Sequence, residues 1–404
     1  MLSRHYKQIL SIAYYLILED KNPLSRFRKW SKLHTHPFGK EIPSQQSTDI
    51  FANITEEQRL NFFRLQCSRR AEKEYIAYDT TSISSYSKSL KQVRHGKNKD
   101  HDKLQQINLA VLYGEESCLP FYYKKLAGNI SDVSTIKQLV SDMDFLGCDG
   151  NKKLVLDRGF CSEKNINDLY TEKLKFLMGT KLSLKYVVAE LARHRETVRD
   201  WRNLLLDSDT FGFSVPIKWH HKRNPKGKIG KNKWMYLHLY YDSIRTLDDE
   251  RALSKLLSQL NYELKSGNLV KTNETLYEQY FTVKSTPVRG TKVTLKEDVV
   301  ANERKNFGYF ALIGNEKLSA ERALDIYRNK DVAEKAFDNV KDRLDMRSLN
   351  VSSELSLDGK LFVAFVALIC VSHLHNAMKR ARLYSKFTMD ELIDELELVE
   401  RFEC

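Results

Sequence analysis

Two short apolar runs, each closed by an aspartate, constrain what this 404-residue chain can fold into. Tyr75–Tyr78 leads into Asp79, and Lys153–Leu156 leads into Asp157. Each run has the composition of a strand, and polar or turn-forming residues follow each aspartate. A carboxylate that is taken out of water needs an ion partner or a metal to offset its desolvation. Both aspartates therefore predict such a partner.

A third acidic residue lies on a segment with helical periodicity, residues 327–341. At about 100° per residue, one side of this helix carries Tyr327, Lys330, Glu334 and Lys341. An apolar flank of alanine, valine and phenylalanine would hold Glu334 near the edge of a buried interface. Glu334 and the two aspartates together offer the hard oxygen ligands that Mg²⁺ prefers. The alternative is a solvated amphipathic helix with Glu–Lys pairs.

These blocks resemble the DDE transposases of insertion sequences. The segment AYDTTSIS matches the family's first aspartate at Asp79, and LVLDRGF matches the second at Asp157. The signature Y-x2-R-x3-E-x6-K, which surrounds the catalytic glutamate of the family, is matched at Tyr327, Glu334 and Lys341. The resemblance covers roughly residues 5–385 in ordered blocks.

One position departs from the signature, because Lys330 stands where the family has arginine. A lysine keeps the positive charge but loses the planar, bidentate grip on phosphate. The stretch Gly128–Asp132, between the two aspartates, also resembles a stretch of the family.

The resemblance implies metal-dependent cleavage and strand transfer at the terminal inverted repeats of an insertion sequence. Asp79, Asp157 and Glu334 would be the catalytic residues and would bind two Mg²⁺ ions, for which Mn²⁺ can substitute. Double-stranded DNA would be the partner, and the joining of two ends implies a homodimer on DNA. No nucleotide cofactor is expected, since neither phosphate-binding glycine motif follows a strand. Contacts to the DNA backbone are expected from Tyr327, Lys330, Lys341 and Arg158.

Two alternatives to this function stay open. The fold could act as a metal-dependent DNA nuclease that does not catalyse strand transfer. It could instead be a catalytically defective, DNA-binding relative of the transposases. The replacement at Lys330 favours the defective relative, and so does an N-terminal region shorter than that of many relatives. Retention of all three acidic positions favours an enzyme.

Further strand-like runs predict the fold class, an α/β protein with a ribonuclease H-like mixed-sheet core. A meander of three strands, followed by a helix and more strands, has the order of that sheet. This order places Asp79 on the first strand and Asp157 at the end of the fourth, and neighbouring strands are ~5 Å apart. Strands are predicted at Tyr75–Tyr78, Gln106–Leu112, Cys118–Lys124, Lys153–Leu156 and Lys175–Met178, with a helix at about Val133–Phe145.

The long gap between Asp157 and Glu334 predicts an insertion, and its runs of strand-forming residues predict that it is mainly β, with a helical patch at Asp248–Leu264. The N-terminal region either contacts the transposon ends or forms a solvated helical cap on the core. The predicted divisions are an N-terminal helical region over residues 1–72, the first part of the core over 73–206, the β-rich insertion over 207–305, the second part of the core over 306–385 and a C-terminal helix over 386–404.

The insertion contains a basic stretch bordered by Trp219 and Trp234. Basic residues with aromatic neighbours suit a nucleic-acid backbone and an unstacked base. The alternative is that both tryptophans belong to the core of the β-rich segment. The candidate DNA-binding residues of this stretch are Lys222, Arg223, Lys226 and Lys228.

The composition limits the class of binding partner and the cellular compartment that we expect. The chain has 66 Lys+Arg against 53 Asp+Glu, a net charge of +13, which favours a polyanion without choosing among nucleic acid, ribosome and membrane surface. Its six cysteines form no C-x-x-C pair, which fits a protein of the reducing cytoplasm. We expect it to be associated with DNA there. The apolar run Leu361–Val371 is shorter than the roughly 20 residues of a membrane span, so we expect a core helix and no membrane anchor.

Overall fold

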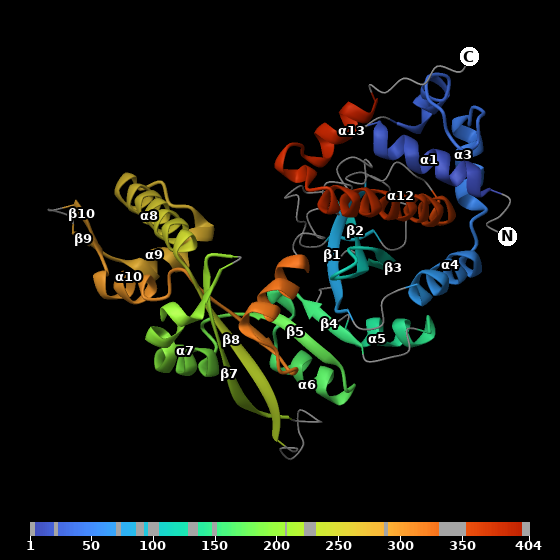
Figure 1. The fold of residues 1–404 in the computed structure, drawn as a ribbon. Coiled ribbons are helices and arrows are strands. Elements are labelled where there is room, and N and C mark those ends of the chain that lie inside the picture. Colours follow the sequence, from blue (N-terminus) through green and yellow to red (C-terminus); the bar gives the residue numbers. More distant parts are fainter. Residues whose placement is uncertain are drawn as a thin grey trace. The chain divides into compact units, whose positions relative to one another are not determined.

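The computed structural model describes residues 5–19, 23–69, 74–85, 93–95, 105–127, 136–147, 152–206, 208–221, 232–286, 290–330 and 353–397. The chain divides into two compact units (Figure 1). The first contains residues 1–178, 220–231 and 325–404, and the second contains residues 179–219 and 232–324. The predicted insertion therefore falls in the second unit, apart from residues 220–231.

The first unit is built on a mixed sheet with the strand order β3-β2-β1-β4-β5. The first three strands pair antiparallel, and β4 pairs parallel with both β1 and β5. This arrangement confirms the predicted ribonuclease H-like order of a meander followed by parallel strands. The strands are β1 (Ile76–Ser85), β2 (Gln105–Gly114), β3 (Pro120–Ala127), β4 (Lys153–Leu156) and β5 (Lys175–Thr180).

The short strand β4 lies in the parallel part of the sheet, between β1 and β5. Leu154, Val155 and Leu156 are all completely buried. A strand that is apolar on both faces suits the interior of a parallel sheet, where helices cover both sides. The polar residue that ends it, Asp157, is exposed at the strand's C-terminal end.

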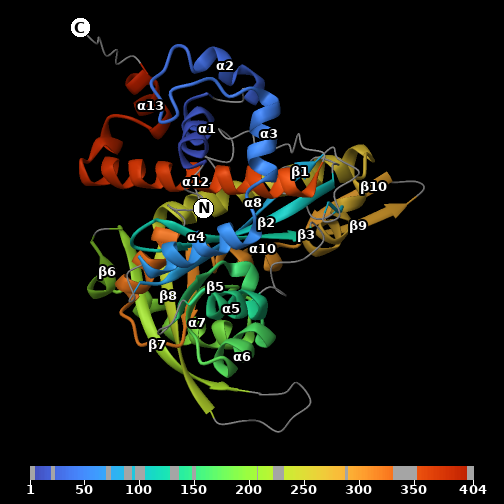
Figure 2. The same ribbon diagram turned by 90° about the vertical axis from the view of Figure 1, so that its right-hand side faces the viewer.

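Helices cover this sheet, and the longest of them is sandwiched. Helix α12 lies against the strands on one side and against α1 and α3 on the other (Figures 1 and 2). At Gly359 the approach is so close that a Cβ atom would lie 2.1 Å from the carbonyl oxygen of Phe51. The helices of this unit are α1 (Tyr6–Leu18), α2 (Phe27–Trp30), α3 (Ser44–Ala52), α4 (Glu56–Ser68), α5 (Ile136–Phe145), α6 (Glu163–Thr171), α12 (Glu354–Arg380) and α13 (Met389–Glu397).

Aromatic side chains join α4, β3 and α12. The ring of Phe63 on α4 lies 5.1 Å from Tyr122, 5.3 Å from Tyr123 and 5.6 Å from Phe365, in edge-to-face geometry. Thr55 caps α4 through a reciprocal capping box with Gln58. The N-terminal helices are therefore packed onto the core of the first unit.

Helix α12 is also apolar and long enough to be compared with a membrane span. Of the described helices, it is the one whose length and composition would allow a crossing. However, 72% of its most apolar window is buried inside the protein. That burial is the pattern of a core helix, as the sequence predicted.

The second unit combines strands in the order β11-β8-β7-β6 with a two-stranded β9–β10 ribbon. Strand β8 pairs antiparallel with β11. Its strands are β6 (Leu204–Leu205), β7 (Thr210–His220), β8 (Asn232–Asp242), β9 (Phe281–Thr286), β10 (Gly290–Leu295) and β11 (Tyr309–Gly314), and its helices are α7 (Lys185–Val198), α8 (Ser243–Ser266), α9 (Glu274–Tyr280) and α10 (Glu297–Arg304).

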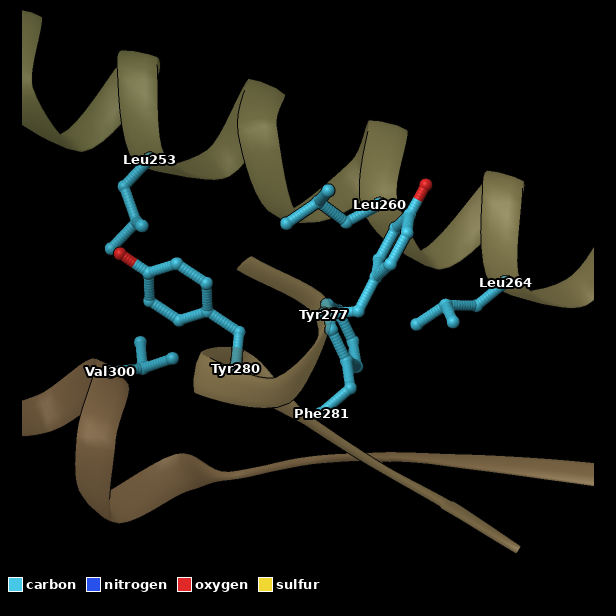
Figure 3. Close-up of a cluster of buried hydrophobic side chains, with 7 residues drawn as sticks. All are labelled: Leu253, Leu260, Leu264, Tyr277, Tyr280, Phe281 and Val300. Carbon is cyan, nitrogen blue, oxygen red and sulfur yellow. The ribbon is translucent and has the colours of Figure 1, made fainter. Parts of the chain in front are cut away.

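The insertion is more helical than its composition predicted. Helix α8 has 24 residues, and one of its faces turns toward α9, β9 and α10 (Figure 3). Leucines spaced at three, four and seven residues form a stripe on this face, which favours a helix over a strand. The buried cluster consists of Leu253, Leu260, Leu264, Tyr277, Tyr280, Phe281 and Val300.

Candidate active site

The backbone register of β1 and β4 sets the position of both aspartates. The last parallel pair of residues between these strands is Tyr78 and Leu156. Asp79 and Asp157 each come directly after this pair, so they are neighbours in the register of the two strands. Asp157 follows the fourth strand, as predicted, but the first strand, which was predicted to end at Tyr78, continues through Asp79 to Ser85. The structure describes the backbone of Asp79, which lies opposite Val111 of β2, but its side chain is outside the described part.

The carboxylate of Asp157 is held by two side chains from the helix over residues 320–330. The hydroxyl of Tyr327 donates a hydrogen bond to Oδ1 of Asp157 at 3.2 Å. The ammonium nitrogen of Lys330 lies 3.8 Å from the same oxygen and 5.5 Å from the centre of the Tyr327 ring. The helix that leads toward Glu334 in the sequence is thus in contact with the end of β4.

Lys330 has a different position from the phosphate contact that the sequence predicted. Its side chain is 1% exposed, whereas that of Asp157 is 56% exposed. A buried ammonium needs a negative partner to offset its desolvation. Lys330 therefore stabilises an acidic strand end, while Arg158, the next residue after Asp157, is exposed.

The same helix is also anchored to the end of β2. The hydroxyl of Tyr113 donates to the carbonyl oxygen of Lys330 at 3.0 Å, and the side-chain amide of Asn329 donates to Oε1 of Glu115 at 2.9 Å. Tyr113 and Glu115 are both buried. Sequence reasoning missed these residues, although Glu115 also follows an apolar run of the sequence, as Asp79 and Asp157 do. That repeated pattern of a strand followed by a carboxylate was the available signal.

The start of the basic stretch is held in the first unit by a histidine. His221 is 8% exposed, and its Nε2 lies 3.2 Å from the hydroxyl of Thr171 and 3.3 Å from the carbonyl oxygen of Asn167. Both partners belong to α6, the helix that follows Asp157. The chain thus enters the basic stretch from a fixed point on α6.

The two tryptophans that border this stretch have different surroundings. Trp219 is half-buried, and its ring lies 5.9 Å from that of Tyr186 in edge-to-face geometry. Trp234 is 57% exposed, with the Lys218 ammonium 5.9 Å from its ring centre. Of the two, Trp234 presents more surface on which a base could stack.

Several predicted site residues lie outside the described part of the chain. These residues are Glu334, Lys341, Lys222, Arg223, Lys226 and Lys228. Within the described ranges, no group of three or more His, Cys, Asp or Glu side chains could hold a metal ion. The strand ends nevertheless offer carboxylates, which are the donors that a hard divalent cation takes. The donor chemistry of the two aspartates therefore fits such an ion.

A family model described as "Transposase DDE domain" matches residues 70–370. A solved structure of a piggyBac transposase synaptic complex with hairpin DNA is similar at a TM-score of 0.45 and 8% identity, over 97% of this chain and 70% of that chain. That likeness is too low to carry an argument.

Two curated relatives are DNA ligases. The one from Ehrlichia chaffeensis (strain ATCC CRL-10679 / Arkansas) is 24% identical over 200 residues, 47% of this chain. The one from Ehrlichia canis (strain Jake) is 25% identical over 185 residues, 42% of this chain. The matches span only 28% and 25% of the length of these ligases, so they do not assign a ligase activity. The family match, in contrast, covers more than half of the chain and contains both Asp79 and Asp157, and the chain therefore belongs to the transposase DDE domain family.

Proposed function

We propose that this protein cleaves DNA at the terminal inverted repeats of an insertion sequence and joins the freed 3′ ends to target DNA. A transposase of this family acts on DNA as a polynucleotidyl transferase or nuclease that uses divalent metal ions. The observation that carries the finer proposal is the register of β1 and β4, in which Asp79 and Asp157 follow the pair Tyr78 and Leu156.

The proposed chemistry is phosphoryl transfer without a covalent protein intermediate. Asp79, Asp157 and Glu334 would hold two Mg²⁺ ions, for which Mn²⁺ can substitute. When bound, these ions supply activation of the attacking oxygen and stabilisation of the leaving oxygen in an in-line displacement. The protein's part is to position carboxylates and DNA, and Tyr327 fixes the orientation of Asp157 through its hydrogen bond.

Other residues would hold the DNA itself. Arg158 is exposed beside Asp157 and would contact phosphates next to the scissile bond, together with Lys341. Trp234 is exposed and would stack on an unstacked base. Because two ends must meet in one synapse, we propose a homodimer on DNA that works in the cytoplasm of a bacterium or archaeon.

The test is cleavage of a labelled duplex that carries the cognate element's terminal repeats, with Mg²⁺ or Mn²⁺. We expect the wild type to nick the duplex at the repeat boundary. Asp157→Asn should still bind DNA, but its cleavage should be slower by on the order of 10²-fold or more, because one carboxylate ligand is lost. Cleavage by Asp157→Asn at the wild-type rate would contradict this assignment of the active site.

A second reaction separates the proposal from its two alternatives. A pre-cleaved end is supplied together with target DNA. Joining of the two supports strand transfer, whereas cleavage without joining indicates a nuclease. Tight binding with neither reaction indicates a catalytically defective relative.

A further inference from the structure

Asp157 is ion-paired with a lysine that the fold has removed from water. The Lys330 side chain is 1% exposed, and its Nζ lies 3.8 Å from Oδ1 of Asp157. This distance is too long for a good hydrogen bond, so the interaction acts mainly through charge. Burial strengthens it, because charges at the edge of a protein interior are less screened than charges in water.

Two contacts to the carboxylate of Asp157 that the structure describes fall on the same oxygen. Tyr327 donates to Oδ1 at 3.2 Å, and Lys330 lies beside the same Oδ1. A metal held by Asp157 would share this carboxylate with Tyr327 and Lys330. The ammonium of Lys330 and such a cation would then repel each other, because both are positive and both would be beside one carboxyl group.

Lys330 is also held at its backbone. Its carbonyl oxygen accepts the hydrogen bond from Tyr113, and the preceding residue, Asn329, is bound to Glu115. Both anchoring side chains are buried, and they hold the helix backbone at Lys330. The positive charge of Lys330 is thus a fixed part of the site.

We propose that Lys330 is a built-in counter-ion of Asp157 that competes with the divalent cation for this carboxylate. The inference rests on the proposed function, since it takes Asp157 as a metal ligand. The lysine stabilises the acidic strand end before the metal binds, and its like charge weakens metal binding afterwards. Lys330 is therefore a positioning residue that sets the metal affinity of the site.

The experiment is calorimetric titration of the full chain with MnCl₂, without DNA, for the wild type and Lys330→Met. Methionine keeps a similar length and removes the charge. We expect the Mn²⁺ dissociation constant of Lys330→Met to fall about tenfold, because one repulsive unit charge is lost. Lys330→Arg restores the charge, and its dissociation constant should stay within about twofold of the wild type. If Lys330→Met does not fold, Lys330→Gln carries the same expectation.

A matched control separates metal affinity from general stability. Lys125 is a half-buried lysine of the same unit that pairs with Glu354 at 2.8 Å and with Asp358 at 2.6 Å. Lys125→Met should lower the melting temperature and leave the Mn²⁺ affinity unchanged. A role of Lys330 that is merely structural would give Lys330→Met the same behaviour as this control.

The two proposals fail in different ways. Asp157→Asn should abolish or strongly weaken Mn²⁺ binding, and wild-type affinity in this variant would overturn the metal site and hence the proposed function. If Asp157→Asn loses the metal but Lys330→Met binds Mn²⁺ with unchanged or lower affinity, the counter-ion role of Lys330 is wrong and the proposed function stands.

Discussion

Single residues of one chemical type have different roles in this protein because their surroundings differ. Lys330 is buried beside Asp157, while Lys218 is exposed near Trp234. Trp219 packs against Tyr186, while Trp234 is 57% exposed. The desolvation of each group, more than its type, decides whether it can meet DNA or must be paired inside the protein.

His238 on β8 is a single residue that makes the stability of the folded protein depend on pH. It is fully buried with its Nδ1 2.7 Å from the hydroxyl of Ser214, and burial lowers its pKa to about 4. Since the pKa is lower in the folded state than the ordinary 6.5, unfolding takes up a proton at acidic pH. Above pH 6.5, His238 makes its full contribution to the free energy of unfolding. As the pH falls toward 4, the free energy of unfolding decreases by up to roughly 3 kcal/mol because of this residue.

The check is chemical denaturation of the wild type and His238→Gln between pH 4 and pH 8. The glutamine variant is expected to be less stable at neutral pH but to lose less stability on acidification, because it has no proton to take up. Parallel pH curves for the two proteins would show that His238 does not titrate on unfolding.

At the level of elements, the helix over residues 320–330 is positioned by strands that are distant in sequence. Tyr113 and Glu115 at the end of β2 hold it from one side, and Asp157 at the end of β4 contacts it from another. Because Glu334 follows this helix in the sequence, the anchors would also determine where the third carboxylate lies. Local sequence around Glu334 contains none of these partners.

Asn329→Ala tests this anchor. The variant removes the amide that donates to buried Glu115, and we expect a loss of about 1–3 kcal/mol in the free energy of unfolding. Single-turnover cleavage should slow by roughly tenfold or more, since small displacements of positioned groups are costly. DNA affinity should stay within about twofold of the wild type.

The control for this prediction is Asn53→Ala, which removes an exposed side-chain hydrogen bond at the end of α3. We expect little change in either cleavage or stability there. Equal cleavage rates for Asn329→Ala and the wild type would contradict a positioning role of the anchor.

At the level of the whole molecule, the net charge of +13 is large and its placement matters. The basic stretch starts at His221, which α6 holds through Thr171 and Asn167. A basic segment that is held at one end can follow a DNA backbone and release the counterions of the DNA. We therefore expect this stretch, rather than the total charge, to dominate the salt dependence of DNA binding.

A fourfold alanine variant of Lys222, Arg223, Lys226 and Lys228 tests this expectation. The slope of log affinity against log salt should become less steep by about 3–4, because each phosphate contact contributes about 0.9. Fluorescence anisotropy with duplex DNA at increasing KCl concentrations measures the slope. A control variant with the same charge loss replaces Arg251, Lys255, Lys265 and Lys271, which are exposed on and after α8. Equal slopes for the two variants would favour net charge over the basic stretch.

Much of the core could be predicted because its strands are marked locally. Each strand of the first unit contains a short apolar run, and the order of these runs restricts the topology. The positions of Asp79 and Asp157 followed from that order, and the register of β1 and β4 agrees with it. In the second unit the prediction was less complete, because helix α8 buries its leucine stripe only against later segments of the chain.

The sequence by itself determined the family, the strand order and the identity of the acidic residues, since these depend on local composition and spacing. Only the tertiary structure decided which atoms meet: that Lys330 is buried at Oδ1 of Asp157, that Glu115 holds Asn329 and that Trp234 remains exposed. The physical reason is that burial and pairing are set by contacts between residues far apart in sequence. Those contacts decide whether a charged or aromatic group stabilises or destabilises the folded protein, and the chemical type of the group alone does not.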